Sequence, residues 1–206
     1  GAAQPIPEAV APDPPPLELM SGSAQTTGAN IVGEVTRQGI GPSVLTGPGT
    51  GPSKYVALGD SFASVGRIAP ASWGPGPITC VRTDDAYPTV VARELGVGTF
   101  VNASCGGAVT DDFWAPGRTG APPQLEALDA DTDLVTVSLG GNDIGFGQIA
   151  GCVVQTPAAE TGAVCRDRLE GIVTAELDGL AARLDEIYDG IRQRSPDARI
   201  VTTGYL

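Results

Sequence analysis

The stretch Tyr55-Val56-Ala57-Leu58-Gly59-Asp60-Ser61 decides the fold of this chain. Its four leading residues form a short apolar run that stops at a glycine, which predicts a buried strand ending in a turn. Ser61 follows that turn directly, where a side chain is held clear of the sheet. A nucleophilic serine would be placed in this way, although Gly-Asp-Ser is also a common turn tripeptide.

Three further strands are expected along the chain. The apolar runs Thr99–Ala103 and Leu134–Leu139 each end in a glycine-bearing turn, at residues 104–107 and 140–143 respectively. The last strand covers Arg199–Thr203. Three of the four strands therefore end in turns that contain glycine.

Two amphipathic segments separate these strands. Apolar residues recur at steps of three and four over Asp85–Leu95 and, most clearly, over Asp167–Arg194, which predicts two helices. Alternating strands and helices predict an α/β fold with three layers, α/β/α, around a central parallel sheet. Ligand sites in such sheets lie beyond the carboxyl ends of the strands, so we expect the three turns to converge on one crevice.

Composition excludes several classes of partner. The 206 residues include 12 Lys and Arg against 24 Asp and Glu, with a net charge of −12. This acidity argues against nucleic acid and against anionic membrane surfaces as partners. No apolar run is long enough for a transmembrane helix. The hydrophobic fraction of 41% is sufficient for a packed core.

The chain contains no histidine. By itself it therefore cannot form a Ser-His-Asp triad, a Cys-His pair or a histidine-ligated metal site. We expect no metal and no cofactor. Any catalysis that requires an imidazole must obtain it from elsewhere.

The four cysteines are Cys80, Cys105, Cys152 and Cys165. An even number on loops rich in glycine and proline favours two disulfides and hence a secreted or otherwise extracytoplasmic protein, over the alternative of four free thiols in a cytosolic one. Three pairings are possible, and a local one across the polar stretch between Cys152 and Cys165 is plausible. The residues alone leave the choice open.

Composition changes near residue 50. Residues 1–50 hold 8 of the 18 prolines and only five charged residues, which predicts a mobile arm or linker rich in proline and glycine. We expect the folded domain to cover residues 51–206.

Three blocks of this sequence resemble the SGNH (GDSL) hydrolases, in the family's order. Residues 55–66 look like the first block, residues 102–108 (Asn-Ala-Ser-Cys-Gly-Gly-Ala) are similar to the second, and residues 138–146 (Ser-Leu-Gly-Gly-Asn-Asp-Ile-Gly-Phe) to the third. The likeness is strongest to secreted actinobacterial lipases and esterases, extends over about residues 54–206, and also includes Gly204-Tyr205. It implies the three-layer fold of this family, which is similar to that of flavodoxin.

The resemblance also implies residue roles. Ser61 would be the nucleophile of an ester hydrolase that forms an acyl-enzyme, and its own N–H would join the oxyanion hole. Gly107, with Gly106 as runner-up, would donate a backbone N–H, and Asn142 a side-chain amide. Sequential disulfides in these relatives imply the pairs Cys80–Cys105 and Cys152–Cys165. The supporting residues of the blocks are Gly59, Asp60, Gly106, Gly141 and Asp143.

One family element is absent from the sequence. The family's histidine base stands in an Asp-x-x-His block near the C-terminus, and this chain has no such block. We expect a domain that is incomplete at its C-terminus, with a complementary C-terminal segment as partner and an ester or acylated small molecule, lipid or glycan as substrate. The alternatives are an inert ligand-binding or interaction domain, an acyl or acetyl transferase acting on sugar or lipid, and a carboxylate that replaces the base, at Asp60, Asp111 or Asp143.

Two other patterns have competing interpretations. Asp129, Asp131 and Asp133 alternate as in a calcium loop, but a solvated loop is favoured because the glycine and distal glutamate of an EF-hand are missing. Trp73, Phe113 and Trp114 are candidates for an acyl or sugar pocket, or for ordinary packing.

Overall fold

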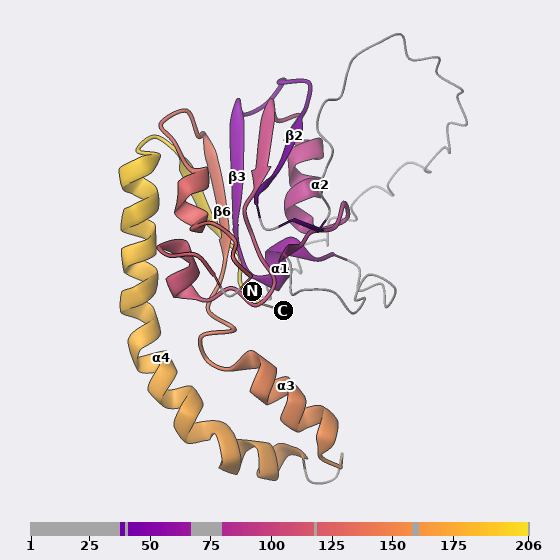
Figure 1. Ribbon diagram of the computed structural model, residues 1–206, viewed down its shortest axis with the longest axis vertical. Helices are drawn as coiled ribbons and strands as arrows, with labels where there is room; N and C mark the ends of the chain where they lie inside the picture. Colours follow the sequence, from indigo (N-terminus) through magenta and orange to yellow (C-terminus); the bar gives the residue numbers. More distant parts are fainter. Residues whose placement is uncertain (1–37, 40, 67–79, 118, 158–160, 206) are drawn as a thin grey trace, which may run out of the picture. The chain divides into compact units, whose positions relative to one another are not determined.

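The computed structural model describes residues 38, 39, 41–66, 80–117, 119–157 and 161–205 (Figure 1). Its main sheet has five strands in the order β2-β5-β3-β6-β7. The bounds are Ser43–Thr46 for β2, Lys54–Gly59 for β3, Thr99–Asn102 for β5, Leu134–Ser138 for β6 and Arg199–Thr202 for β7. The four strands expected from the sequence are all present and mutually parallel.

One strand departs from the expected parallel sheet. β2 pairs antiparallel with β5, from Ser43 opposite Asn102 to Thr46 opposite Thr99. The sheet is therefore mixed, with an antiparallel edge strand. It also begins before the boundary that we expect at residue 50, because the proline- and glycine-rich region contributes this edge. Residues 1–37 of the predicted arm lie outside the described residues.

Helices cover both faces of the sheet (Figure 1). They are α1 (Ser61–Ser64), α2 (Tyr87–Glu94), α3 (Phe146–Gln155) and α4 (Thr161–Arg194), with two short 3₁₀ helices, η2 (Thr110–Phe113) and η3 (Gln124–Ala127). α4 begins six residues before the helix expected from its apolar periodicity. A second, two-stranded sheet joins β1 (Gln38–Gly39) to β4 (Cys80–Val81).

The core is divided by the sheet. Val56 and Leu58 face one side and pack with residues of η2, η3 and α4, among them Ile187. Tyr55 and Ala57 face the other side, in a cluster with Ala92 of α2. Successive side chains of a strand point to opposite faces, so a run that is apolar throughout must be covered twice. This arrangement confirms the predicted three-layer α/β class.

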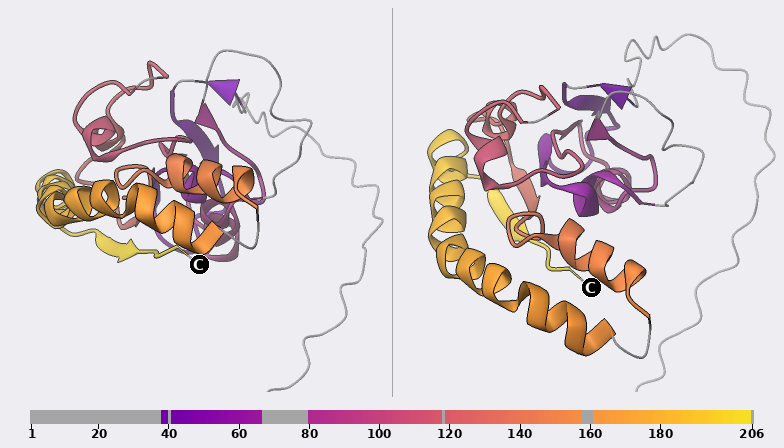
Figure 2. Two further views of the ribbon diagram at one scale, coloured as in Figure 1. Left: turned by 90° about the horizontal axis from the view of Figure 1, so that it is seen from below. Right: turned by 60° about the horizontal axis from the view of Figure 1, so that its bottom comes forward.

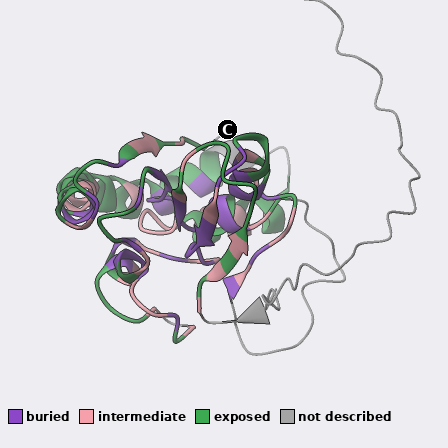
Figure 3. Ribbon diagram, turned by 90° about the horizontal axis from the view of Figure 1, so that it is seen from above, coloured by how far each residue is buried: buried purple, intermediate pink, exposed green. Residues whose placement is uncertain are grey.

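α3 and the first half of α4 extend away from the sheet as a helical pair (Figure 2). The disulfide Cys152–Cys165 joins them, and Leu169 packs against it. Buried residues otherwise concentrate on the strands (Figure 3). None of the helices in the described ranges combines the length and the apolar character that a membrane span requires.

Candidate active site

The turn after β3 places Ser61 at the start of α1. Asp60 is buried, and its Oδ1 accepts a hydrogen bond from the N–H of Phe62 at 2.8 Å, which caps the helix. The N–H of Asp60 donates to the carbonyl of Ser138 on β6 at 3.0 Å. Gly59 has a φ of 134°, and a Cβ there would lie 2.1 Å from that same carbonyl oxygen. Only glycine fits at this position, because any side chain would collide with the backbone of β6. Two residues further on, Ser61 is exposed.

The carbonyl of Ser61 accepts the N–H of Val65, but the two groups that matter for catalysis, its hydroxyl and its N–H, are free within the described part of the chain. Neither its hydroxyl nor its N–H makes a hydrogen bond there. The glycine-bearing turn after β5 approaches this serine, because a Cβ built at Gly106 would lie 4.0 Å from the Ser61 Cβ. Two of the three predicted turns are thus side by side.

The turn after β5 presents a second unpaired donor. The N–H of Cys105 donates to the carbonyl of Gly59 at 3.0 Å, and the N–H of Ala108 closes the turn onto Cys105. Gly107 has a φ of 80°, in the region that favours glycine. Across the described residues, its N–H meets no acceptor. Cys105 is bonded to Cys80, which anchors this turn to β4.

The turn after β6 brings a side-chain amide to the same place. Asn142 is half-buried, and its Nδ2 donates to the carbonyl of Ala108 at 2.9 Å. That bond uses one of the two amide hydrogens and holds Asn142 beside the Gly106–Ala108 turn. Ser61, Gly107 and Asn142 therefore come from three strand ends to one edge of the sheet.

The carboxylate of Asp143 connects the turn after β6 with η2 and α4. Its carboxylate accepts from the N–H of Thr110 at 3.1 Å and from the Thr110 hydroxyl at 2.6 Å. The Nε of Arg183 lies 3.7 Å from the same oxygen. The resemblance points to Asp143 as a supporting residue, but neither Thr110 nor Arg183 has a sequence signal that would predict its part in this contact.

Tyr205 connects the first and third turns. Its hydroxyl donates to Oδ2 of Asp60 and accepts from the N–H of Gly141 at 2.9 Å. Burial raises the pKa of the Asp60 carboxyl, an effect that the bonds from Tyr205 and Phe62 partly offset. Burial and the contact with Asp60 also raise the pKa of Tyr205. The Gly-Tyr resemblance marked this tyrosine, but not its contact with Asp60.

The side-chain amide of Gln124 makes two hydrogen bonds to the backbone of Gly59, in the same turn. Its Oε1 accepts from the N–H of Gly59 at 2.7 Å, and its Nε2 donates to the Gly59 carbonyl at 2.9 Å. The side chain is 3% exposed. Nothing in the sequence distinguishes this glutamine from any other loop glutamine, so its role is found only in the structure.

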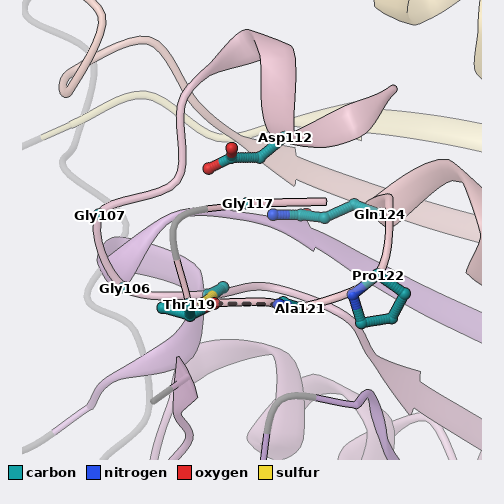
Figure 4. A pocket seen from close by; sticks show the side chains of 9 residues that line it. Gly106, Gly107, Asp112, Gly117, Thr119, Ala121, Pro122 and Gln124 are labelled. Carbon is teal, nitrogen blue, oxygen red and sulfur yellow. Dashed lines mark hydrogen bonds between the residues drawn. The ribbon is translucent and has the colours of Figure 1, made fainter. Parts of the chain in front are cut away.

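A small pocket is lined in part by Cys105, Gly106 and Gly107 of the turn after β5. Figure 4 shows Gln124, Asp112 and Thr119 around it, beside Gly106 and Gly107. Its volume of about 20 Å³ suffices for a single water and not for an acyl chain. Of the aromatic candidates, Phe113 is fully buried in the core, which fits ordinary packing, whereas Trp114 is half-exposed with the guanidinium of Arg194 over its ring. Trp73 lies outside the described residues.

Within the described residues, none of the three carboxylates that could replace the base makes a hydrogen bond to Ser61. The carboxylate of Asp60 accepts hydrogen bonds from the Phe62 N–H and the Tyr205 hydroxyl, and that of Asp143 accepts one from the Thr110 hydroxyl. Asp111 is exposed and makes no hydrogen bond to Ser61.

The aspartates that alternate before β6 support the strand. Asp129 pairs with Lys54, and Asp133 accepts the N–H groups of Ser53 and Lys54. Within the described ranges no cluster of side chains fits a metal ion.

A mixed α/β sheet with these three turns at its carboxyl edge defines a fold of the SGNH type. The chain belongs to the GDSL-like lipase/acylhydrolase family, whose sequence profile matches residues 57–206. It is 35% identical over 155 residues to "Lipase 2" of Streptomyces coelicolor, covering 73% of this chain and 52% of that protein. It is 32% identical over 164 residues to a lipase of Streptomyces rimosus, covering 79% of this chain and 56% of the relative.

Solved structures agree with this assignment. The extracellular lipase of Streptomyces rimosus superposes with a TM-score of 0.57 at 34% identity, covering 74% of this chain and 60% of that one. Phospholipase A1 of Streptomyces albidoflavus superposes with a TM-score of 0.55 at 32% identity, covering 78% and 60%. The chain thus spans little more than half the length of these relatives.

Proposed function

We propose that this chain carries the nucleophile and the oxyanion hole of a serine ester hydrolase. The observation that carries the proposal is that Ser61, Gly107 and Asn142 meet at one edge of the sheet with unpaired donors. The hydroxyl of Ser61 attacks the ester carbonyl and expels the alcohol, which leaves an acyl-enzyme that water then resolves. The N–H groups of Ser61 and Gly107 and the Asn142 amide stabilise the negative charge on the carbonyl oxygen.

The base in this proposal is a histidine from outside the 206 residues. The chain has no histidine, and in its described part neither Asp60 nor Asp143 makes a hydrogen bond to the Ser61 hydroxyl. A segment with the family's Asp-x-x-His block would supply the imidazole. The relatives' printed names, lipase, esterase and phospholipase A1, support lipid-like esters as the substrate class. Two disulfides and an extracellular relative support a location outside the cytoplasm.

Chemical rescue tests the proposal on the chain itself. The protein is treated with a fluorophosphonate, with and without added imidazole, and the modified residue is located by peptide mass spectrometry. We expect slow labelling of Ser61 that imidazole accelerates, and loss of that label in Ser61→Ala. Ser64, on the same short helix but buried, is the internal control and stays unmodified.

Two results would contradict this function. Labelling that is spread over several serines, or is unchanged in Ser61→Ala, would show that Ser61 is not an activated nucleophile. A folded sample that stays unlabelled at high imidazole would favour the inert ligand-binding domain.

A further inference from the structure

A second cavity lies near the carboxyl end of β5, apart from Ser61. Its volume is about 220 Å³. Small apolar side chains form most of its wall, together with one buried arginine and one exposed glutamate. The lining residues are Pro42, Arg82, Ala103, Ala121, Pro122, Pro123, Glu126 and Ala127. Ala121 and Pro122 also line the small pocket beside Gly106 and Gly107 (Figure 4). Because the two pockets share these residues, the second cavity adjoins the candidate oxyanion loop.

Arg82 is the unusual member of this wall. Its side chain is 6% exposed, and it makes two hydrogen bonds, from Nε to the carbonyl of Ser104 at 2.8 Å and from Nη1 to the carbonyl of Gly41 at 2.7 Å. Both acceptors are neutral. Throughout the described part of the chain, no carboxylate pairs with this guanidinium, and Nη2 meets no acceptor.

A buried positive charge without a counter-charge is costly. Burial lowers the pKa of Arg82 to about 10, so the guanidinium still carries its charge at neutral pH. The two carbonyl contacts give Arg82 a structural role, because they connect Gly41, just before β2, with Ser104, just after β5. These contacts with neutral carbonyls do not explain why a fully charged side chain lies beside an apolar cavity. An anionic ligand in the cavity would compensate that charge.

We propose that this cavity binds a monocarboxylate with a short aliphatic chain, its carboxylate paired with Arg82. Guanidinium and carboxylate match in planar, bidentate geometry, and the proline and alanine walls suit methylene groups. An apolar cavity of roughly 150 Å³ accommodates benzene, so this one has room for a chain of about six carbons. The site does not require Ser61 to be a nucleophile, so it stands independently of the proposed function.

Calorimetric titration of the 206-residue chain with hexanoate tests the site. Hexan-1-ol is the control for the charge and acetate the control for the chain. We expect hexanoate to bind at least tenfold more tightly than either. Comparable binding of acetate would show a bare anion site, and comparable binding of hexanol a purely apolar one; each result would overturn the proposal, as would no binding at all.

Four variants, one of them a control, locate the binding. Arg82→Met is expected to lose at least tenfold in hexanoate affinity, and the exposed Arg166→Met, which removes a distant charge on α4, to lose nothing. Arg82→Met removes two structural bonds, so two further variants leave Arg82 intact. Ala127→Leu adds bulk to the wall and should weaken binding, whereas Glu126→Gln removes a repelling charge and should tighten it roughly two- to fivefold. Hexanoate affinity that is the same in Ala127→Leu and Glu126→Gln as in the parent would refute the site.

Discussion

The hydroxyl of Tyr205 donates a hydrogen bond to the carboxylate of Asp60, which lies 145 residues earlier in the chain. The same hydroxyl accepts the N–H of Gly141. Because Asp60 caps the helix that begins at Ser61, this contact connects the nucleophile turn to the turn after β6. The position of Ser61 relative to Asn142 therefore depends on the chain that follows β7.

Removal of the Tyr205 hydroxyl should loosen this connection. Tyr205→Phe keeps the edge-on contact with Phe62, whose ring centroid is 5.4 Å away, but leaves Asp60 and Gly141 without their common partner. We expect a loss of about 1–2 kcal/mol in the free energy of unfolding, measured by urea denaturation. Tyr188→Phe is the matched control, since its hydroxyl bonds to an exposed Thr202. An equal loss in both variants would show that the bridge has no special importance.

Asp60 predicts a specific pH dependence of stability. Its pKa is raised in the folded state, so over the interval above its unfolded value the folded protein binds more protons than the unfolded one. Stability should therefore fall as pH rises through that interval. Asp60→Asn, which retains a good helix cap, should remove this slope.

The measurement is the stability difference between the parent and Asp60→Asn, by urea denaturation from about pH 3 to about pH 8. Asp129, whose pKa is lowered by its contact with Lys54, has the opposite slope but contributes equally to both proteins. A difference that is flat, or that rises with pH, would argue against a raised pKa for Asp60.

Gln124→Ala should be strongly destabilising for a loop substitution. It leaves the buried N–H of Gly59 without an acceptor, although the Gly59 carbonyl keeps the N–H of Cys105. We expect a loss of about 2–3 kcal/mol by urea denaturation. Gln148→Ala, at an exposed position of α3, should change stability by less than about 0.5 kcal/mol. One exposed hydrogen bond contributes about 1 kcal/mol. A smaller loss for Gln124→Ala would mean that water replaces Gln124 as the acceptor for the Gly59 N–H.

Asn142→Ala should lower catalysis in a form of the protein that carries the histidine base. Loss of one oxyanion-hole donor reduces kcat by about 10²- to 10³-fold, with little change in KM. Ester hydrolysis is the assay, and Gln155→Ala at the exposed end of α3 is the control amide. An unchanged kcat in Asn142→Ala would remove this residue from the oxyanion hole.

The disulfide Cys152–Cys165 should stabilise the α3–α4 pair locally. It closes a loop with a sequence separation of 13, which corresponds to about 3 kcal/mol in the chain-entropy account. With both cysteines replaced by alanine, we expect faster amide hydrogen exchange in α3, read by mass spectrometry, and unchanged exchange in β3. Equal acceleration in both elements would indicate that the disulfide stabilises the whole fold.

Much of the fold could be predicted from local patterns. The apolar run before Gly59 and the periodicity of residues 167–194 each reflect burial of a regular element, which is encoded within a few residues. The edge strand β2 could not be predicted, because Ser43–Thr46 is surrounded by glycine and proline and becomes a strand only by pairing with β5. The second expected pairing of cysteines, Cys80 with Cys105, rested on resemblance and is present in the structure.

By itself, the sequence determined the class of this protein, the three glycine-bearing turns, and the absence of an imidazole. These are matters of residue type and short-range spacing. Only the tertiary structure decided that Tyr205 bonds to Asp60, that Gln124 clamps Gly59, and that Arg82 is buried beside a cavity without a counter-charge. The physical reason is that these contacts join residues far apart in the chain. Their geometry exists only once the strands have paired and the loops have packed on them.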